Sequence, residues 1–413
     1  MQSLSPAAPQ RLAYVIDTLV TGGAERLVVT FAKAVEARAD MHLTVFVLND
    51  QKTPFLEEIK ATQTDVICLP GKSLVDPRRF VRVVAELRRR EIDFVHAHLI
   101  TSTVVAGFAA RLLGLPFATT IHNVKPSTAR VSTVRGKLYR AVLALPGITR
   151  IAVGQAVADA AQVDTGDRPC LVVPNAVAPE AVLSDTERST ARTALRAALG
   201  FEAPGAQMVL AVGAIIGQKA YDDMLKAFSK VADNAPLARL MIAGKAPEPD
   251  RLGALEQQIL DLGLEDRVQF LGLRRDIPAL LAAADVFLSA SHWEGAPVSL
   301  LEAMANGLPC VMTDVGDNAR ILAGTGTPLA PPHAPDALAE VLLTLLQSPD
   351  RARTCGLASQ KRVSETYSVD AWVDRLSEIY RPAAPAKNTV RGMGQRKRSL
   401  SHLTQKPEGE RAK

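Results

Sequence analysis

Aromatic residues and cysteines are scarce in this chain. Phe, Trp and Tyr make up 4% of its 413 residues, and its four cysteines show no paired spacing. The cysteine spacing therefore suggests no zinc site and no disulfide framework, and it fits a reducing compartment. The first eleven residues also lack the basic and apolar regions of a signal peptide. The whole chain is 47% apolar and 22% charged, which is the composition of a soluble globular protein. Its length of 413 residues predicts about two domains.

One segment is long and apolar enough to suggest a membrane span. Residues 99–121 are almost all apolar or small. However, Arg111 lies near the centre, where an isolated charge is costly in a bilayer, and Gly114 and Pro116 interrupt the run. We therefore favour a helix followed by a buried strand over a transmembrane helix.

Positive charge is concentrated at the C-terminus. Residues 381–413 have a net charge of +7, whereas the whole chain has +5, so the preceding residues are slightly acidic. The low hydrophobicity of this tail predicts disorder. The tail either only solubilises the protein or draws it to an anionic leaflet, together with the segment 81–90, which is apolar on one face and ends in three arginines. We expect a cytoplasmic protein, peripheral on the inner face of the plasma membrane, and no nucleic-acid partner.

Short apolar runs alternate with amphipathic segments, and the alternation occurs twice. The first set of predicted strands is Leu12–Ile16, Leu43–Leu48, Val66–Leu69, Phe94–His96, Phe117–Ile121, Ile151–Val153 and Leu171–Val173. The second set is Met208–Val212, Arg239–Ile242, Val268–Phe270, Val286–Leu288 and Pro309–Met312. Strands that alternate with helices predict an α/β fold with two Rossmann-like, doubly wound domains that face a central cleft.

The most informative stretch contains two glutamates eight positions apart. Pro297 suits the first turn of a helix, and Gly307 followed by Pro309 ends it. Glu294 then lies on the loop before the helix and Glu302 in its second turn. Two carboxylates at this spacing can accept hydrogen bonds from the two ends of a polyhydroxylated ligand, and the helix N-terminus between them can receive a phosphate. Spacing alone does not distinguish this site from a loop glutamate beside a solvated helical glutamate.

The stretch resembles the E-x7-E signature of the family-4 retaining glycosyltransferases, which have the GT-B fold. Further segments resemble that family in the right order across roughly residues 11–380. They are Thr21-Gly22-Gly23-Ala24-Glu25-Arg26, Thr120-Ile121-His122-Asn123, Val173-Pro174-Asn175, Gln218-Lys219 and Thr313-Asp314-Val315-Gly316.

The resemblance implies a role for each matching residue. Glu294 would hold sugar hydroxyls, Glu302 the ribose and Lys219 the diphosphate, with His122 beside the donor sugar. Periodicity alone does not choose among His96, His98 and His122, which all follow predicted strands. The remaining donor-binding residues that the resemblance implies are Gly22, Gly23 and Ala296. Arg320 is a further candidate for donor binding, although it lies in a segment that departs from the family pattern.

Two segments depart from the family pattern, and the first of them lacks a positive charge. The family motif Gly-Arg-x-x-x-x-Lys-Gly is here Gly213-Ala214-Ile215-Ile216-Gly217-Gln218-Lys219-Ala220, without the arginine and the second glycine. After the E-x7-E helix, Gly316-Asp317 replaces the usual Gly-Gly. Arg320 is a candidate substitute for the missing cation, although it could equally begin the next element.

The expected organisation combines pattern and resemblance. We expect a first domain over residues 1–176 on the acceptor side and a second over residues 177–368 on the donor side, joined by a linker near residues 174–189. Residues 369–382 would form the helix that crosses back in GT-B proteins, and residues 383–413 the basic tail.

The expected reaction is transfer of a hexosyl or N-acetylhexosaminyl group, with retention, from a nucleotide-diphosphate sugar to a lipid-linked or oligosaccharide acceptor in bacterial surface polysaccharide or glycolipid assembly. No Asp-x-Asp motif in a strand context occurs, so we expect a metal-independent site without a cofactor. Front-face transfer is favoured, because no motif places a nucleophilic carboxylate in the first domain. Two alternatives are a GT-B nucleotide-sugar epimerase and a non-catalytic protein that binds sugar nucleotide or polysaccharide.

Overall fold

The computed structural model describes residues 9–20, 22–73, 76–124, 133–166, 168–178 and 182–381. One compact unit, Met1–Ile379, contains both sheets. Of the second unit, Tyr380–Lys413, only Tyr380 and Arg381 are described. The predicted disordered tail thus lies outside the described residues.

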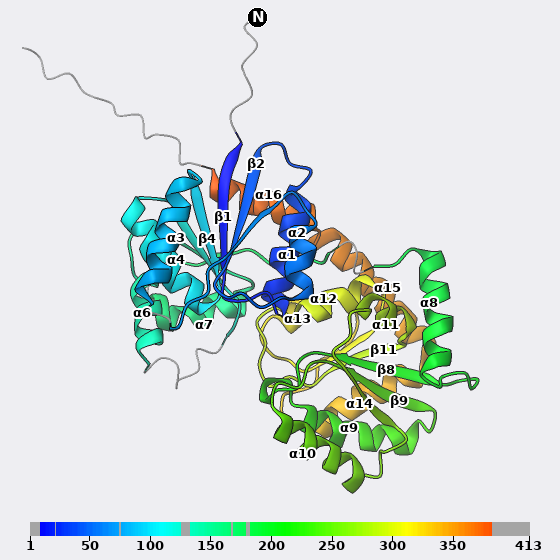
Figure 1. Cartoon of the computed structure of the whole chain (residues 1–413). Coiled ribbons are helices and arrows are strands. Elements are labelled where there is room, and N and C mark those ends of the chain that lie inside the picture. The colour runs from blue at the N-terminus through cyan, green and yellow to red at the C-terminus, as the bar shows by residue number, and fades with distance from the viewer. Residues whose placement is uncertain are drawn as a thin grey trace, which may run out of the picture. The chain divides into compact units, whose positions relative to one another are not determined.

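The first sheet has the strand order β3-β2-β1-β4-β5-β6-β7, and every pair is parallel (Figure 1). Its strands are β1 Gln10–Ile16, β2 Met41–Val47, β3 Asp65–Cys68, β4 Phe94–His98, β5 Phe117–Ile121, β6 Ile148–Ala152 and β7 Leu171–Val172. The helices of this half are α1 Gly23–Val35, α2 Pro54–Lys60, α3 Pro77–Arg89, α4 Ile100–Leu113, α6 Val134–Leu143 and α7 Gln155–Thr165. Each predicted strand of this half is confirmed to within about three residues at its ends.

Alternation along the strands sends side chains to both faces of the sheet. Ala13 and Val15 of β1 belong to a buried cluster with residues of α3, α4 and α6. Tyr14, between them, points to the other face, where its ring stacks on Phe31 of α1 with centroids 4.4 Å apart. A strand buried on both sides reads as a continuous apolar run, which is why β1 was recognisable in the sequence.

The second sheet has the order β10-β9-β8-β11-β12, again all parallel. Its strands are β8 Gln207–Val212, β9 Ala238–Ala243, β10 Val268–Gly272, β11 Val286–Ser289 and β12 Cys310–Met312. The helices that follow β7 are α8 Asp185–Ala198, α9 Tyr221–Asn234, α10 Pro249–Asp261, α11 Ile277–Ala283, α12 Val298–Ala305, α13 Asn318–Ile321, α14 Pro335–Leu346, α15 Pro349–Thr366 and α16 Val369–Tyr380. One face packs on α9, α10 and α14, and the other on α11 and α12. The doubly wound α/β prediction is confirmed for both halves.

The apolar segment 99–121 forms a helix and a strand, as predicted. Helix α4 ends at Leu113, and Gly114 adopts a left-handed conformation with φ 68° that terminates it. Strand β5 follows from Phe117. No helix in the described part of the chain is both long and apolar enough to cross a membrane.

Two helices differ from the sequence prediction. Helix α8 begins at Asp185, inside the segment expected to be linker, and a capping box of Ser184 and Glu187 starts it. Helix α15 was not predicted, because its buried face carries mainly small residues such as Gly356 and Ser359 and shows no apolar period. A Cβ at Gly356 would lie 2.1 Å from the Gly307 carbonyl oxygen, so the close approach of α15 requires glycine there.

Helix α16 carries contacts to the first half of the chain. The ring of Trp372 lies edge-on to Phe31 of α1, with centroids 5.8 Å apart. Arg38, which follows α1, pairs with Asp374 at 2.9 Å.

Candidate functional site

The strand order reverses at one place in each sheet. These switch points lie between β1 and β4 in the first sheet and between β8 and β11 in the second. Doubly wound folds bind ligands beyond the carboxyl ends of the strands at such points. The segments that leave β1, β8 and β11 there contain Gly22, Lys219 and Glu294, respectively.

Glu294 is buried and held by three side chains from both sides of the second switch point. Its Oε1 accepts hydrogen bonds from Ser291 Oγ at 2.6 Å and from Lys219 Nζ at 2.5 Å. Gln218 Nε2 donates to its Oε2 at 3.2 Å. The carboxylate is therefore paired and fixed in orientation, as a buried charge must be.

Lys219 lies in a 3-10 turn, Gly217–Lys219, that immediately precedes α9. The next residue, Ala220, is buried and left-handed with φ 48°. This conformation favours glycine, the residue that the family pattern has there. The alanine at position 220 therefore holds a backbone conformation beside Lys219 that glycine would adopt at lower cost.

Glu302 contrasts with Glu294. It lies in the second turn of α12, and no side chain among the described residues donates a hydrogen bond to its carboxylate in the structure. Burial raises the pKa of Glu302 to about 7, and the nearby positive charge of Arg26 opposes part of that rise. A carboxylate in this state gains from ligand hydroxyls that donate to it.

Three histidines lie close together on the first sheet: His96 and His98 in β4, and His122 directly after β5. His98 Nδ1 lies 3.2 Å from His122 Nε2, and His96 Nε2 lies 2.7 Å from Thr120 Oγ1. Burial lowers the pKa of His122 to about 4 and that of His96 to about 3, and it also lowers the pKa of His98. All three imidazoles are therefore neutral near pH 7. The cavity that they line is about 10 Å³, room for roughly one water and too small for a sugar ring.

Gly22 and Gly23 are exposed at the N-terminus of α1, where Gly22 as the N-cap residue has no capping side chain and the Glu25 carboxylate accepts a backbone hydrogen bond. Free N–H groups at such an end attract anions. A Cβ at Gly23 would lie 3.2 Å from Val298 Cγ2, in the first turn of α12. The glycine loop therefore lies against the start of the E-x7-E helix.

Three further contacts join the two halves beside Glu294. A Cβ at Gly295 would lie 2.3 Å from the carbonyl oxygen of His122, so only glycine fits after Glu294. Asn175 Nδ2 donates to the carbonyl oxygen of Ala296 at 2.7 Å. The backbone N–H of Ala156, at the start of α7, donates to Asp317 Oδ1 at 3.1 Å.

Arg320 lies beside Asp317 and not beside Glu294, the carboxylate partner of Lys219. Its Nε is 3.5 Å from Asp317 Oδ1, and its side chain is 68% exposed. Burial raises the pKa of Asp317, although backbone donors from the start of α7 offset part of the effect. The structure therefore gives Arg320 a carboxylate partner in Asp317.

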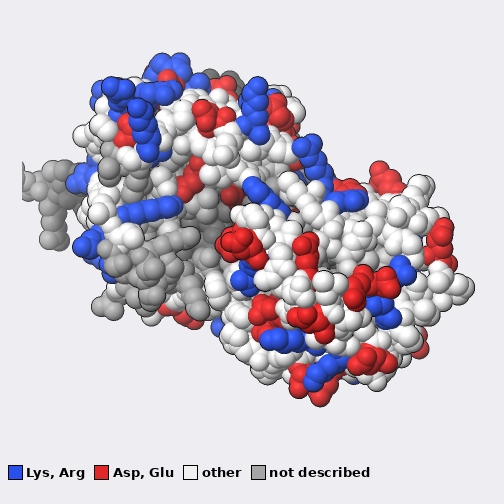
Figure 2. Space-filling model, turned by 60° about the horizontal axis from the view of Figure 1, so that its bottom comes forward, with Lys and Arg blue, Asp and Glu red and all other residues white. Residues whose placement is uncertain are grey.

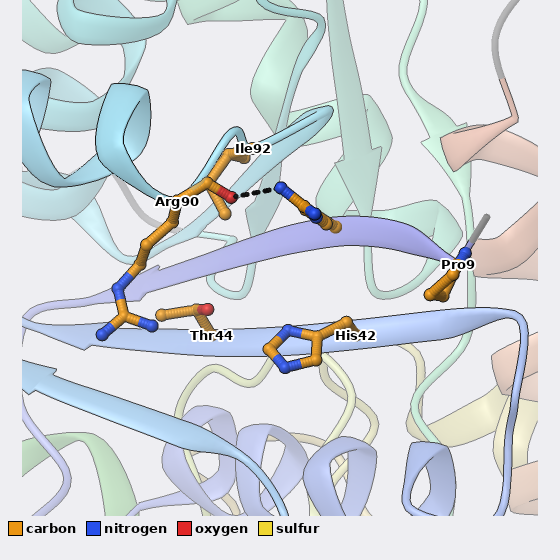
Figure 3. Close-up of a pocket in the computed structure, with 6 residues that line it drawn as sticks. Pro9, His42, Thr44, Arg90 and Ile92 are labelled. Atoms are coloured by element: carbon orange, nitrogen blue, oxygen red, sulfur yellow. Dashed lines mark hydrogen bonds between the residues drawn. The ribbon is translucent and has the colours of Figure 1, made fainter.

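A larger cavity, about 300 Å³, lies at the opposite edge of the first sheet, where β1 and β2 begin (Figure 3). Its two arginines already pair with acidic groups, Arg11 with Glu91 and Arg90 with Asp65 and Glu86. Since it lies at the wrong edge of the sheet for a doubly wound site and its cations are neutralised, we do not place the ligand there.

Comparisons with known proteins agree with the fold. The family described as "Glycosyltransferase Family 4" matches residues 21–181, and "Glycosyl transferases group 1" matches residues 206–348. Both halves resemble glycosyltransferases. The first match covers the glycine loop and His122, and the second covers Lys219 and both glutamates.

Two relatives and one solved structure illustrate the similarity. The chain is 26% identical over 281 residues to the UDP-Gal:alpha-D-GlcNAc-diphosphoundecaprenol alpha-1,3-galactosyltransferase of Escherichia coli, a match that covers 64% of this chain and 69% of the relative. It is 31% identical over 196 residues to mannosylfructose-phosphate synthase of Agrobacterium fabrum, covering 46% of this chain but only 42% of that protein. Alr3699/HepE of Anabaena, solved with UDP-glucose, superimposes with a TM-score of 0.78 at 23% identity, covering 89% of this chain and 98% of that one.

The chain has the GT-B fold, and the family matches support a glycosyltransferase. Sequence reasoning missed Ser291 and Asp317 as supporting residues. The only sequence signal for Ser291 was its place at the end of a buried strand, and Asp317 appeared only as a departure from the family's second glycine.

Proposed function

We propose that this protein transfers a sugar from a nucleotide-diphosphate donor to an acceptor, with retention of configuration. The observation that supports this most is the pair Lys219–Glu294 at the switch point of the second sheet. Each member of the pair would bind a different part of the same ligand. Sugar hydroxyls can donate to Glu294, and a diphosphate can replace Glu294 as the partner of Lys219.

Lys219 would stabilise the negative charge that develops on the diphosphate as the glycosidic bond breaks. Glu302 would accept hydrogen bonds from the ribose, and Gly22, Gly23 and Ala296 would bring backbone groups close to the ligand. The neutral His122 would support the sugar through hydrogen bonding. The proposed transfer is metal-independent and uses no cofactor, with the acceptor attacking the face that the diphosphate leaves.

We further propose a uridine diphosphate hexose as the donor, because HepE, which shares the fold, was solved with UDP-glucose. The E. coli relative is named for a diphosphoundecaprenol acceptor, and this supports a lipid-linked saccharide as the acceptor here. The protein would act at the inner face of the plasma membrane, in surface polysaccharide or glycolipid assembly.

Membrane attraction would depend on charge and not on insertion of α3. The apolar face of α3 is occupied, since Val83 and Leu87 are buried in the core. The expectation that this helix offers an apolar face to a membrane is therefore wrong. Arg78, Arg82 and Arg88 of α3 are exposed, whereas Arg89 pairs with Glu86. On the face shown in Figure 2, Lys and Arg side chains gather at the upper left.

The test is a donor-hydrolysis assay with UDP-, GDP- and ADP-sugars, with NMR of the released or transferred sugar to read its anomeric configuration. Turnover of one donor with retention supports the proposal. Tight binding of a sugar nucleotide without any turnover would instead identify a non-catalytic binding protein. The observation that favours this alternative is Ala214, which stands where the family pattern has an arginine. Interconversion of two donors would identify an epimerase.

A further inference from the structure

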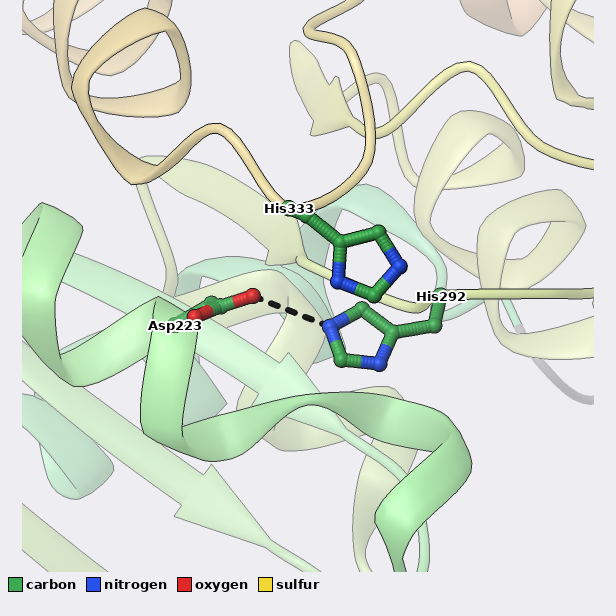
Figure 4. Close-up of side chains that lie close together, drawn as sticks. All are labelled: Asp223, His292 and His333. Carbon is green, nitrogen blue, oxygen red and sulfur yellow. Dashed lines mark hydrogen bonds and ion pairs between the residues drawn. The ribbon is translucent and has the colours of Figure 1, made fainter.

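A second group of polar side chains lies on the outer side of the loop that carries Glu294. Asp223 is in the first turn of α9, His292 follows β11, and His333 precedes α14 (Figure 4). One potential ligand atom from each lies within 4.8 Å of the other two. His292 Nε2 is 2.9 Å from Asp223 Oδ2, and the two imidazole rings have centroids 3.8 Å apart.

We propose that Asp223, His292 and His333 bind one transition-metal dication of the Zn²⁺ type. Imidazole nitrogens and a carboxylate oxygen suit this class of ion, and a water molecule would supply the fourth ligand. Ligand atoms ~2.0–2.1 Å from a tetrahedral zinc lie roughly 3.3 Å from one another. The three atoms, which lie within 4.8 Å of one another, would close to that spacing, and the two imidazole rings would turn so that one nitrogen of each points at the ion.

The backbone at His333 provides an independent reason to expect a ligand. His333 has φ 60° and is exposed, with Pro332 before it and Pro335 starting α14. A left-handed conformation costs a residue other than glycine about 1–2 kcal/mol and marks functional positions more often than others. Here it holds the imidazole over His292, a place that a solvated surface histidine has no reason to occupy.

The nearby positive charge is compatible with this assignment. Lys226 Nζ lies 3.5 Å from Asp223 Oδ1, on the oxygen that does not face His292, and its side chain is 54% exposed. The lysine can therefore move into solvent when an ion binds. The metal would join the start of α9, the Glu294 loop and the segment before α14, and so fix the loop from outside without touching the donor.

The test uses untagged full-length protein, stripped with a chelator and titrated with Co²⁺ and then Zn²⁺. The expected result is one equivalent of bound metal, the visible absorption of four-coordinate Co²⁺, and a higher melting temperature on Zn²⁺ addition. His333→Asn, which tolerates the left-handed backbone, should weaken binding at least about tenfold. His42→Ala removes an exposed histidine elsewhere and should leave binding unchanged.

His333→Gly separates metal binding from folding. It should raise the melting temperature of the stripped protein, because strain is relieved, and abolish the increase caused by Zn²⁺. Absence of Co²⁺ absorption, or binding that survives both His333→Gly and Asp223→Asn, would overturn the proposal. Neither readout depends on glycosyl transfer.

Discussion

The residues that the two sheets contribute to the candidate site, near the switch point of each sheet, differ in charge. The first sheet brings imidazoles that burial keeps neutral, together with the glycine loop at the N-terminus of α1. The second brings an ion pair, Lys219–Glu294, and a carboxylate whose pKa is near 7, Glu302. In the proposed reaction, charge on the donor diphosphate is handled from the second sheet, whereas the first supplies weaker, uncharged contacts.

The largest effect is expected at the ion pair. Glu294→Gln keeps the size of the side chain but removes the negative charge that pairs with Lys219, and it replaces the charged acceptor for sugar hydroxyls with a weaker, neutral amide oxygen. Hydrogen bonds to charged groups contribute about 1.5–3 kcal/mol, so kcat/KM should fall by roughly 10- to 150-fold. Steady-state kinetics with the best donor measures this, and Glu340→Gln, an exposed glutamate on α14, is the matched control. Equal activity in both variants would remove Glu294 from the site.

The second prediction uses the pKa of Glu302. If ribose hydroxyls donate to its ionised form, nucleotide affinity in the wild type should rise up to about tenfold from pH 6 to pH 8, across the pKa of about 7. Glu302→Gln should show a flat profile. Calorimetric titration with UDP at several pH values measures both, and a pH-independent wild type would contradict the assignment.

Stability should show the opposite trend with pH. The folded state holds the Glu302 proton up to a pKa of about 7, above the ordinary value of 4.5. It therefore binds more protons than the unfolded state between these values, and its stability falls as pH rises through this window. The melting temperature of Glu302→Gln should lack this decline, so the gap between the variant and the wild type should change most between pH 5 and pH 7.

A smaller effect on catalysis is expected at the first sheet. His122→Ala removes a neutral hydrogen-bonding group, worth about 0.5–1.5 kcal/mol, so kcat/KM should fall only about 2- to 13-fold. Since the pKa of His122 is about 4, the pH profile of kcat/KM between pH 5.5 and pH 8 should have the same shape in His122→Ala as in the wild type. A loss as large as that of Glu294→Gln would break the contrast between the two sheets.

Much of this arrangement was predictable from the sequence, but the supporting contacts were not. Strands buried on both faces, such as β5 and β8, appear as apolar runs, and Pro297 and Gly307 marked the E-x7-E helix. Helix α15 was not predicted, because it packs through small residues and its sequence shows no helical period of apolar residues. The Lys219–Glu294 pair joins positions 75 residues apart, and only the folded sheet brings them together.

The three histidines illustrate a second limit. His96, His98 and His122 were equivalent in the sequence, and only their burial and mutual contacts distinguish them. Likewise, Asp317 appeared as a lost glycine, whereas its structural role depends on the start of α7, far away in the chain.

The smallest effects are expected where the two halves meet at Asp317. Asp317→Asn keeps the shape but weakens the acceptor for the Ala156 N–H, so the free energy of unfolding should fall by about 1 kcal/mol. Arg320→Ala removes only an exposed ion partner and should change it by less than about 0.5 kcal/mol. Urea unfolding of both variants measures the difference.

Kinetics of Arg320→Ala then tests its proposed donor contact. If Arg320 replaces the arginine missing at Ala214, this variant should lose activity while its stability stays unchanged, and Ala214→Arg should restore part of the loss. If activity is unchanged in Arg320→Ala, Lys219 supplies the diphosphate cation on the second sheet without help from Arg320. The contrast between the two sheets would then depend mainly on the Lys219–Glu294 pair.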